Sequence, residues 1–351
     1  MAAPPEPRRD PARHDQRGPR PVNPAIVLGT AVSATVVGAL AVEPLRRLAL
    51  RVGLVDHPGG HKAHRAPTPY LGGPAIILGT AVAGVADDPR VHALLFGGLV
   101  FALVGLVDDA RPLGRLPRLA VETPTALLVA VNSVRADLTG VSWLDVTLTA
   151  TWLVFAANAF NLLDNMDGAL GAVTTATGLT LGAAALAAGS GPVALVPFAL
   201  AGSAAGFLVH NWTPARIFMG DCGSLFIGFT VAGCALLVFD GPFHAPAGAL
   251  LATFTATVDT GVVLLARALH HRPLTCGGTD HVAHRLRRVG LPAPVIVYGL
   301  AASAAVSGAL AVAMTLGLLS PLVALSGAGT AAVAGVLAFQ QVDVYRVAVT
   351  A

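Results

Sequence analysis

Carboxylate and carboxamide side chains follow one another at three-residue spacing at the end of a long apolar run. The run "LDVTLTATWLVFAA" leads directly into "NAFNLLDNMDG", residues 158–168. Residues three apart on a helix are neighbours, so the pair Asn161 and Asp164 could share a ligand, and so could Asp164 and Asp167. Each such step turns about 60° around the helix axis, and Gly168 follows at once. We therefore expect the helix to end near Asp164, with the next residues folded over a pocket for a hard cation such as Mg²⁺.

Two further acidic motifs lie at the ends of apolar runs. In "GLVDDARPLGR" the adjacent Asp108 and Asp109 could bind a divalent cation, or one could act as a base because the other raises its pKa. The alternative is a solvated pair at a helix end. In "RIFMGDCGSLFIGF" the glycines on either side of Asp221 permit close approach of a ligand. Asp221 could instead, or in addition, be the N-cap of the following helix.

Two basic segments could bind anionic groups. "VDHPGGHKAHRAPTPYLGG" is rich in turn residues and presents Lys62, His64 and Arg65, which suit phosphates or, alternatively, only lipid headgroups. "RALHHRPLTCGGTDHVAHRLRR" predicts a basic cap over an anionic substrate, with His281 and His284 three apart on one helix face. Zinc is the alternative for the histidines, although their spacing is not that of a zinc site.

The elements that carry these motifs are apolar enough to lie in a membrane. The chain of 351 residues is 54% hydrophobic and only 12% charged. Apolar runs of about 17–24 residues recur, each long enough to cross the hydrocarbon core. We expect an all-α, polytopic integral membrane protein with about 10–11 transmembrane helices. The candidate spans are 25–45, 70–86, 91–107, 118–134, 142–162, 169–188, 192–209, 217–239, 246–269, 292–317 and 320–340.

Charge excludes some functions and assigns the sides of the membrane. The net charge of +3 does not indicate nucleic-acid binding, and the three cysteines form no CxxC pair. The connections after odd-numbered spans, counted together with Arg118 and Arg267 at the span ends beside them, carry fourteen Lys and Arg, against two on the others. By the positive-inside rule the odd connections are cytoplasmic, although five arginines in residues 1–23 then lie outside. All five motifs fall on the odd connections, so we expect them to form one cytoplasmic site.

The five motifs, taken in order, resemble those of the polyprenyl-phosphate N-acetylhexosamine-1-phosphate transferases. This superfamily contains the bacterial WecA- and MraY-type enzymes, and the similarity covers residues 56–286. The histidine motif is closest to the WecA-like branch. The resemblance is carried by "DHPGGHKAHRAPTPYLGGPAI", "GLVDDARPLG", "NAFNLLDNMDG", "FMGDCGSLFIGF" and "DHVAHRL".

The resemblance implies transfer of a sugar phosphate at the cytoplasmic face of the plasma (inner) membrane. The donor would be a UDP-N-acetylhexosamine, most simply UDP-N-acetylglucosamine, and the acceptor a polyprenyl phosphate, either undecaprenyl or decaprenyl. The products would be polyprenyl-diphosphate-sugar and UMP, in cell-envelope glycan biosynthesis. The implied cofactor is Mg²⁺, with Mn²⁺ as the alternative. Partners would be the two substrates, membrane lipids and, as an open alternative, a second copy in a homodimer.

Roles carry over by motif position. Asp221 would be the principal Mg²⁺ ligand, with Asn161 as the second. Asp108 and Asp109 would orient or deprotonate the acceptor phosphate, and Asp164 and Asp167 would line the nucleotide site. The remaining substrate-binding residues would contact phosphates or the sugar, and are Lys62, His64, His281 and His284.

The chain also departs from the family pattern. His61 replaces a usual arginine, Asn165 a glycine, Arg118 a lysine, and Ala283 a histidine. These changes bear on the identity of the sugar rather than on the reaction, and Ala283 argues against the MraY branch.

Two other functions fit parts of the sequence. An ion-coupled transporter would use Glu122 and Asp259, but it predicts polar residues near span midpoints rather than at one face. A non-catalytic relative that binds polyprenyl phosphate is the other alternative. For domain organisation we expect a disordered Pro/Arg-rich tail over 1–23, a transmembrane catalytic domain over 24–341 and a C-terminal tail over 342–351.

Overall fold

The computed structural model describes residues 22–56, 67–86, 88–274 and 278–345, almost all of them helical. The predicted all-α class is confirmed. The long helices are α1 (Pro24–Val52), α3 (Pro89–Ala110), α4 (Arg115–Asn132), α5 (Ser142–Leu163), α6 (Ala169–Ala187), α7 (Gly191–Asn211), α8 (Gly220–Val238), α9 (His244–Leu269), α11 (Ala293–Thr315) and α12 (Pro321–Phe339). The short elements are β1 (Val55–Asp56), β2 (Thr68–Pro69), α2 (Gly72–Thr80), the 3₁₀ helix η1 (Ala81–Val85) and α10 (Val282–Arg288).

Every predicted span coincides with helical structure. Among the described residues nine helices are long and apolar enough to cross a membrane. The second predicted span is instead the short helix α2, continued by η1. The fourth is α4, whose polar residues Arg115, Arg118 and Glu122 lower its hydropathy. Helix α10 is an addition within the ninth connection.

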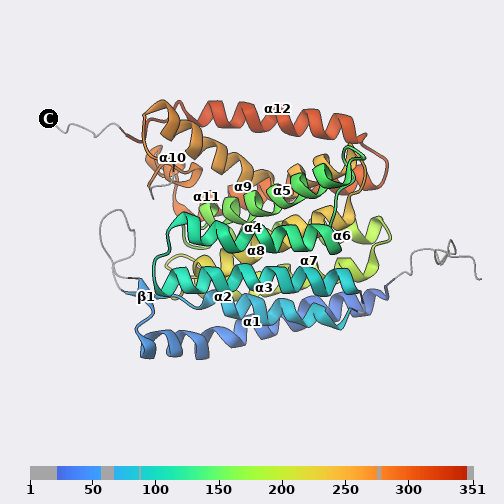
Figure 1. Ribbon diagram of the computed structural model, residues 1–351. Helices are drawn as coiled ribbons and strands as arrows, with labels where there is room; N and C mark the ends of the chain where they lie inside the picture. The colour runs from blue at the N-terminus through green and yellow to red at the C-terminus, as the bar shows by residue number, and fades with distance from the viewer. Residues whose placement is uncertain (1–21, 57–66, 87, 275–277, 346–351) are drawn as a thin grey trace, which may run out of the picture.

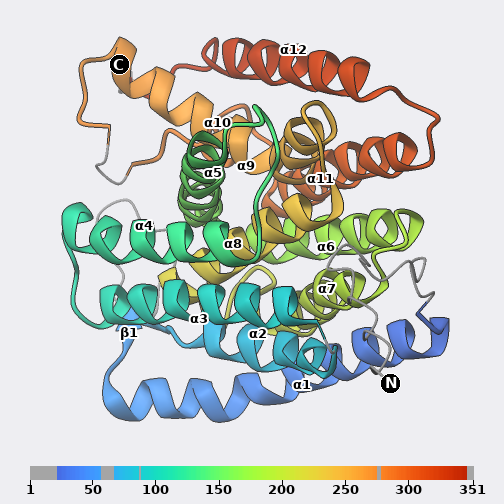
Figure 2. The same ribbon diagram turned by 45° about the vertical axis from the view of Figure 1, so that its right-hand side comes forward.

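Helix α8 lies at the centre of the bundle. Its apolar window is 89% buried, whereas that of α12 at the outer edge is 11% buried. Figures 1 and 2 show α1 at one edge of the molecule and α12 at the other, with α8 between them. Helix α8 packs against α3, α5, α2 and α9. A side chain on its first turn can therefore meet groups from several helices.

Glycines let α8 approach its neighbours closely. A Cβ on Gly105 of α3 would lie 2.4 Å from the carbonyl carbon of Asp221. A Cβ on Gly73 of α2 would lie 2.4 Å from the backbone nitrogen of Gly223. Small residues at such crossings allow the backbones of membrane helices to touch. The start of α8 is thus fixed between α2 and α3.

The odd connections gather at one end of the molecule, as expected. The pair β1–β2 and helix α10 lie at the same end in Figure 1. The amides of Gly72 and Gly73 donate to the carbonyls of Phe218 and Met219, and Phe218 donates back to Pro69. The first and seventh connections are therefore joined directly. We call this end of the bundle the polar end.

Candidate active site

Asp221 occupies the first turn of α8 and is held by two other helices. Its Oδ1 accepts a hydrogen bond from Asn161 Nδ2 at 2.8 Å, and its Oδ2 accepts one from Arg118 Nη1 at 2.8 Å. The alternative that Asp221 is the helix N-cap is wrong, because α8 begins at Gly220 and Met219 is the capping position. The Asp221 carboxylate is therefore directed across the site rather than onto its own helix.

Asp109 fixes the start of α8. Its Oδ1 accepts from the backbone nitrogen of Asp221 at 2.9 Å, and its Oδ2 accepts from that of Cys222 at 3.1 Å. These are amide groups that a helix leaves unpaired at its N-terminus, where a negative charge is also favoured. Gly220 makes this contact possible, since it has φ +69° and a Cβ there would lie 2.4 Å from Asp109 Oδ2.

Asp108 makes different contacts from its neighbour. Its Oδ1 accepts from the backbone nitrogen of Leu113, which closes the turn between α3 and α4. Its Oδ2 accepts from Arg118 Nη1 at 2.9 Å. Asp108 is thus the member of the pair that faces the site, and Asp109 is the one that positions α8.

Arg118 connects four acidic or amide side chains. Besides Asp108 and Asp221, its Nη2 donates to Asn158 Oδ1 at 3.3 Å, and its Nε lies 3.6 Å from Glu122 Oε1. Asn158 Nδ2 in turn donates to Glu122 Oε2 at 2.8 Å. Glu122 is fully buried, and its Oε1 accepts no hydrogen bond from the described residues. We call Arg118, Glu122 and Asn158 the arginine cluster.

Helix α5 ends as the sequence predicts. Leu163 is its last residue and Asp164 its C-cap. Burial, together with the charges of Asp221, Asp109 and Asp167, raises the pKa of Asp164 to about 8. Asp167 Oδ2 accepts from the backbone nitrogen of Ala215 at 2.9 Å. Asn165, which replaces a family glycine, donates to Leu162 O, and its buried Oδ1 has no hydrogen-bond partner among the described residues.

Comparisons with known proteins fit this arrangement. A family model, glycosyl transferase family 4, matches residues 91–239, which run from α3 to the end of α8. A Streptomyces coelicolor protein named as a glycosyltransferase is 38% identical, covering 80% of this chain and 69% of the relative. The chain belongs to glycosyl transferase family 4. The predicted membership of its WecA-like group is confirmed.

Two other family 4 relatives have more specific names. A Bacillus subtilis protein, named as an undecaprenyl-phosphate N-acetylglucosaminyl 1-phosphate transferase, is 29% identical over 76% of this chain and 78% of its own. A phospho-N-acetylmuramoyl-pentapeptide-transferase of Moorella thermoacetica is 33% identical over 59% of this chain and 73% of its own. The family model covers Asp108, Asp109 and Asp221, but it does not reach the basic segments on either side.

The histidines of the ninth connection lie at the polar end but contact a different set of acids. His281 is buried, and its Nδ1 lies 2.8 Å from Asp259 Oδ2. Asp259 Oδ1 accepts from the backbone nitrogen of Val282 at 2.7 Å, so Asp259 caps α10. The rings of His281 and His284 are 5.7 Å apart, as their spacing predicted. Burial and the neighbouring His281 lower the pKa of His284 to about 4, so His284 is neutral near pH 7.

The prediction that the arginines of this connection form a basic cap is wrong for Arg267 and Arg285. Arg267 makes a buried pair with Asp280, with Nε 2.7 Å from Oδ2 and Nη2 3.0 Å from Oδ1. Arg285 Nε donates to Asp280 O, and its Nη1 donates to the carbonyls of residues 339 and 342. These side chains fasten α9, α10 and the end of α12 together. We call Arg267, Asp280 and Arg285 the locked cluster.

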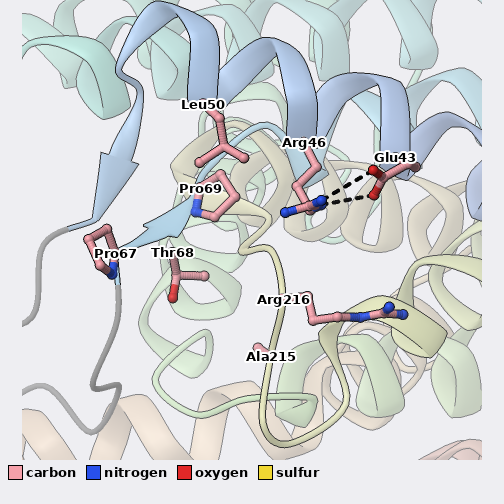
Figure 3. Close-up of a pocket in the computed structure, with 8 residues that line it drawn as sticks. All are labelled: Glu43, Arg46, Leu50, Pro67, Thr68, Pro69, Ala215 and Arg216. Carbon is pink, nitrogen blue, oxygen red and sulfur yellow. Dashed lines mark hydrogen bonds and ion pairs between the residues drawn. The ribbon is translucent and has the colours of Figure 1, made fainter.

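The first basic segment falls largely outside the described residues. Lys62, His64 and Arg65 belong to that part, so their predicted contacts with phosphates stay predictions. The described flank of the segment lines a hollow of about 310 Å³ with Arg46, Glu43, Ala215 and Arg216 (Figure 3). The backbone nitrogen of Ala215 also donates to Asp167 Oδ2, so this hollow adjoins the residues after α5.

The donor atoms present suit a hard cation. The described residues contain no group of three or more His, Cys, Asp or Glu arranged to hold a metal. Mg²⁺ is commonly bound by one or two carboxylates together with substrate phosphates and water, rather than by a complete protein cage. Asp221, with the Asn161 carboxamide beside it, provides such an incomplete set.

Sequence reasoning missed the arginine cluster as a unit. From the sequence alone, Arg118 stands out only as a replacement for lysine, and Glu122 only as a residue that a transporter would use. The four-residue spacing of Arg118 and Glu122 is a signal for a pair on one helix face. Asn158, the first residue of "NAFNLLDNMDG", lies one turn before Asn161 and could have been placed on the same side.

Proposed function

We propose that this family 4 member transfers an N-acetylhexosamine 1-phosphate, most simply that of N-acetylglucosamine, from a UDP-sugar to a polyprenyl phosphate. The observation that carries the proposal is the convergence of Asp108, Arg118, Asn161 and Asp221, from four helices, on one point at the polar end. The name of the Bacillus subtilis relative supports the same reaction and acceptor class.

The reaction is a phosphoryl transfer. An oxygen of the acceptor phosphate attacks the sugar-proximal phosphorus of the UDP-sugar, forming a new P–O bond. The bond from that phosphorus to the bridging oxygen breaks, and UMP leaves with the electron pair. Such transfers depend on positioning and on charge stabilisation rather than on covalent chemistry by the protein.

The side chains of the chain divide this work. Asp221 and Asn161 would hold Mg²⁺, or Mn²⁺ in its place, and the ion would offset the charge of the diphosphate. Asp108 faces the site and is the better placed of the aspartate pair to orient or deprotonate the acceptor. Asp109 keeps the first turn of α8, and so Asp221, in position. Asp164 and Asp167 would line the nucleotide site from the end of α5.

The proposed location follows from the distribution of positive charge. By the positive-inside rule the polar end would face the cytoplasm, where a water-soluble donor can reach a lipid acceptor. The plasma membrane as the location is what the family resemblance implies.

The proposal is tested by UMP release. Purified protein is incubated with polyprenyl phosphate, Mg²⁺ and UDP-N-acetylglucosamine, and UMP is followed with time. Asp221→Asn should reduce the rate about 10²–10³-fold, because it removes charge stabilisation at the reacting phosphates. The Asp221→Asn variant should elute from a size-exclusion column at the same volume as the wild type, which shows that it is folded. No release by the wild type, or undiminished release by the variant, contradicts the proposal.

A second donor class is favoured by one relative. The Moorella thermoacetica protein is named for a muramoyl-pentapeptide substrate, so the corresponding UDP-linked donor belongs in the same assay. We expect the N-acetylglucosamine donor to be preferred. The match to the Bacillus subtilis relative covers 76% of this chain, whereas the match to the Moorella thermoacetica relative covers only 59%. If the protein were instead an ion-coupled transporter or a non-catalytic relative that binds polyprenyl phosphate, no UMP would be released with any donor.

A further inference from the structure

The site has many more acids than bases among the described side chains. Asp108, Asp109, Asp164 and Asp221 lie at the ends of three helices, and Arg118 is the cation that contacts two of them. Both protons of Arg118 Nη1 are used, one toward Asp108 Oδ2 and one toward Asp221 Oδ2. The guanidinium thus occupies the place next to Asp221 where a divalent cation would bind.

A cation at Asp221 must compete with this guanidinium. Two positive groups on one carboxylate repel each other strongly where the surroundings are poorly solvated. Arg118 is 14% exposed, so water cannot fully screen that repulsion. When the cation binds, the guanidinium needs another anionic partner.

The arginine cluster contains such a partner. Glu122 lies one turn further along α4 and is 0% exposed. Its Oε2 is held by Asn158 Nδ2 at 2.8 Å, while its Oε1 lacks a hydrogen-bond partner among the described residues and is 3.6 Å from Arg118 Nε. A buried carboxylate with one unsatisfied oxygen is costly unless a charged group can reach it. A small shift of Arg118 would satisfy it.

We propose that Arg118 is the internal counter-ion of the cation site, and that Glu122, with Asn158, is the positioning residue that receives its guanidinium when a divalent cation binds Asp221. In the cation-free site Arg118 pairs with Asp108 and Asp221 and offsets part of their negative charge. In the loaded site Arg118 is held by Glu122 and Asn158. The inference rests on the proposed function only in that the site takes a divalent cation.

The test is binding of Mn²⁺ to the purified protein without substrate, followed by electron paramagnetic resonance. Glu122→Gln should raise the Mn²⁺ concentration needed for half-saturation about tenfold, a typical coupling between two linked binding events. The double variant Arg118→Gln with Glu122→Gln should bind Mn²⁺ at least as tightly as the wild type, because the competing guanidinium is gone. A double variant that stays as weak as Glu122→Gln overturns the proposal.

Asp145→Asn is the matched control. Asp145 is also buried, at 1% exposed, and lies at the start of α5, about 24 Å from Asn161 along the helix axis. It caps the preceding loop through Thr139 and Leu138. Its neutralisation should leave Mn²⁺ binding unchanged. An equal weakening in Asp145→Asn and Glu122→Gln would overturn the proposal, since it would reflect only the general loss of negative charge.

Two further results keep the inference separate from folding and from the proposed function. If Glu122→Gln does not fold, the variant Asn158→Ala tests the inference instead. It removes the other side chain that is proposed to receive the Arg118 guanidinium. It should weaken Mn²⁺ binding, and unchanged binding overturns the inference. UMP release by Glu122→Gln should recover at high Mg²⁺ with kcat near that of the wild type. Absence of UMP release by the wild type would contradict the proposed function but not the Mn²⁺ result.

Discussion

Two groups of acids and arginines lie at the polar end of this protein, and they differ in how completely they are paired. In the locked cluster, the Asp280 carboxylate accepts hydrogen bonds from Nε and Nη2 of Arg267 and from the Tyr345 hydroxyl, the last at 2.7 Å. Around Asp221, one guanidinium is shared between acids, and Glu122 Oε1 is left without a hydrogen bond among the described residues.

The difference separates a structural group from a binding site. A buried ion pair with all its hydrogen bonds made has nothing left to offer a ligand, and it holds together the elements that carry it. A group with excess negative charge and unsatisfied oxygens can be completed by a cation and by phosphates. Residue type alone does not make this distinction, because both groups consist of Asp, Arg and neighbouring polar residues.

The largest expected effect is on the stability of the locked cluster. Arg267→Met leaves the Asp280 carboxylate buried without its main partner and should lower the free energy of unfolding by about 3–5 kcal/mol. Chemical denaturation in detergent measures this change. In the folded fraction UMP release should be little altered, because Arg267 contacts Asp280 and the carbonyl of Leu274 rather than the carboxylates around Asp221.

Arg135→Met is the control for this variant. Arg135 also pairs with an aspartate, Asp137, but the two side chains are 41% and 60% exposed. Such surface pairs contribute under about 1 kcal/mol. Equal destabilisation by the two substitutions would contradict the view that the locked cluster is a structural element.

A smaller effect is expected from Gly220→Ala, which tests the positioning of Asp221. The substitution imposes left-handed strain of about 1–2 kcal/mol, and its Cβ would lie 2.4 Å from Asp109 Oδ2. Displacement of Asp109 should shift the first turn of α8 and reduce UMP release at least about tenfold, since small errors of position are costly in catalysis.

Gly241→Ala provides a matched comparison for Gly220→Ala. Gly241 has φ +95°, and a Cβ there would meet nothing within 4 Å. Gly241→Ala should therefore show only the loss of stability that comes from backbone strain, with unchanged UMP release. If both variants retain full activity, Asp109 does not position α8 as described.

Much of this organisation could be predicted from the sequence. The end of α5 at Asp164 followed from the spacing of its polar residues and from Gly168, because a helix cannot keep such residues on one face for long. The gathering of the odd connections at one end followed from counting spans. Both depend on local pattern and on parity, which the sequence contains directly.

The pairing between helices could not be predicted in the same way. Arg118 and Asp221 are 103 positions apart, and their contact depends on how α4 and α8 are rotated and tilted. Arg285 was predicted to face a substrate but donates to the carbonyls of residues 339 and 342. The same arginine can serve either purpose, and the choice depends on where the carbonyls of residues 339 and 342 lie relative to α10.

The last prediction is a pair of opposite pH dependences of stability, one from Asp164 beside Asp221 and one from His284 on α10. The pKa of Asp164 rises from 3.8 to about 8 on folding, because its charged form is buried among other acids. Between these values the unfolded chain has released a proton that the folded chain keeps, so stability falls as pH rises. The pKa of His284 instead falls from 6.5 to about 4, so stability there rises with pH between those values.

The two contributions overlap and oppose each other between about pH 4 and 6.5, and only that of Asp164 remains up to about pH 8. We therefore expect the thermal midpoint of Asp164→Asn, measured with EDTA, to rise relative to that of the wild type as the pH increases toward 8. The thermal midpoint of His284→Gln should fall relative to that of the wild type between about pH 4 and 6.5. Parallel curves for the three proteins would show that neither group is linked to folding. Addition of Mg²⁺ should flatten only the curves of the proteins that keep Asp164, because a cation in the site stabilises the ionised carboxylate.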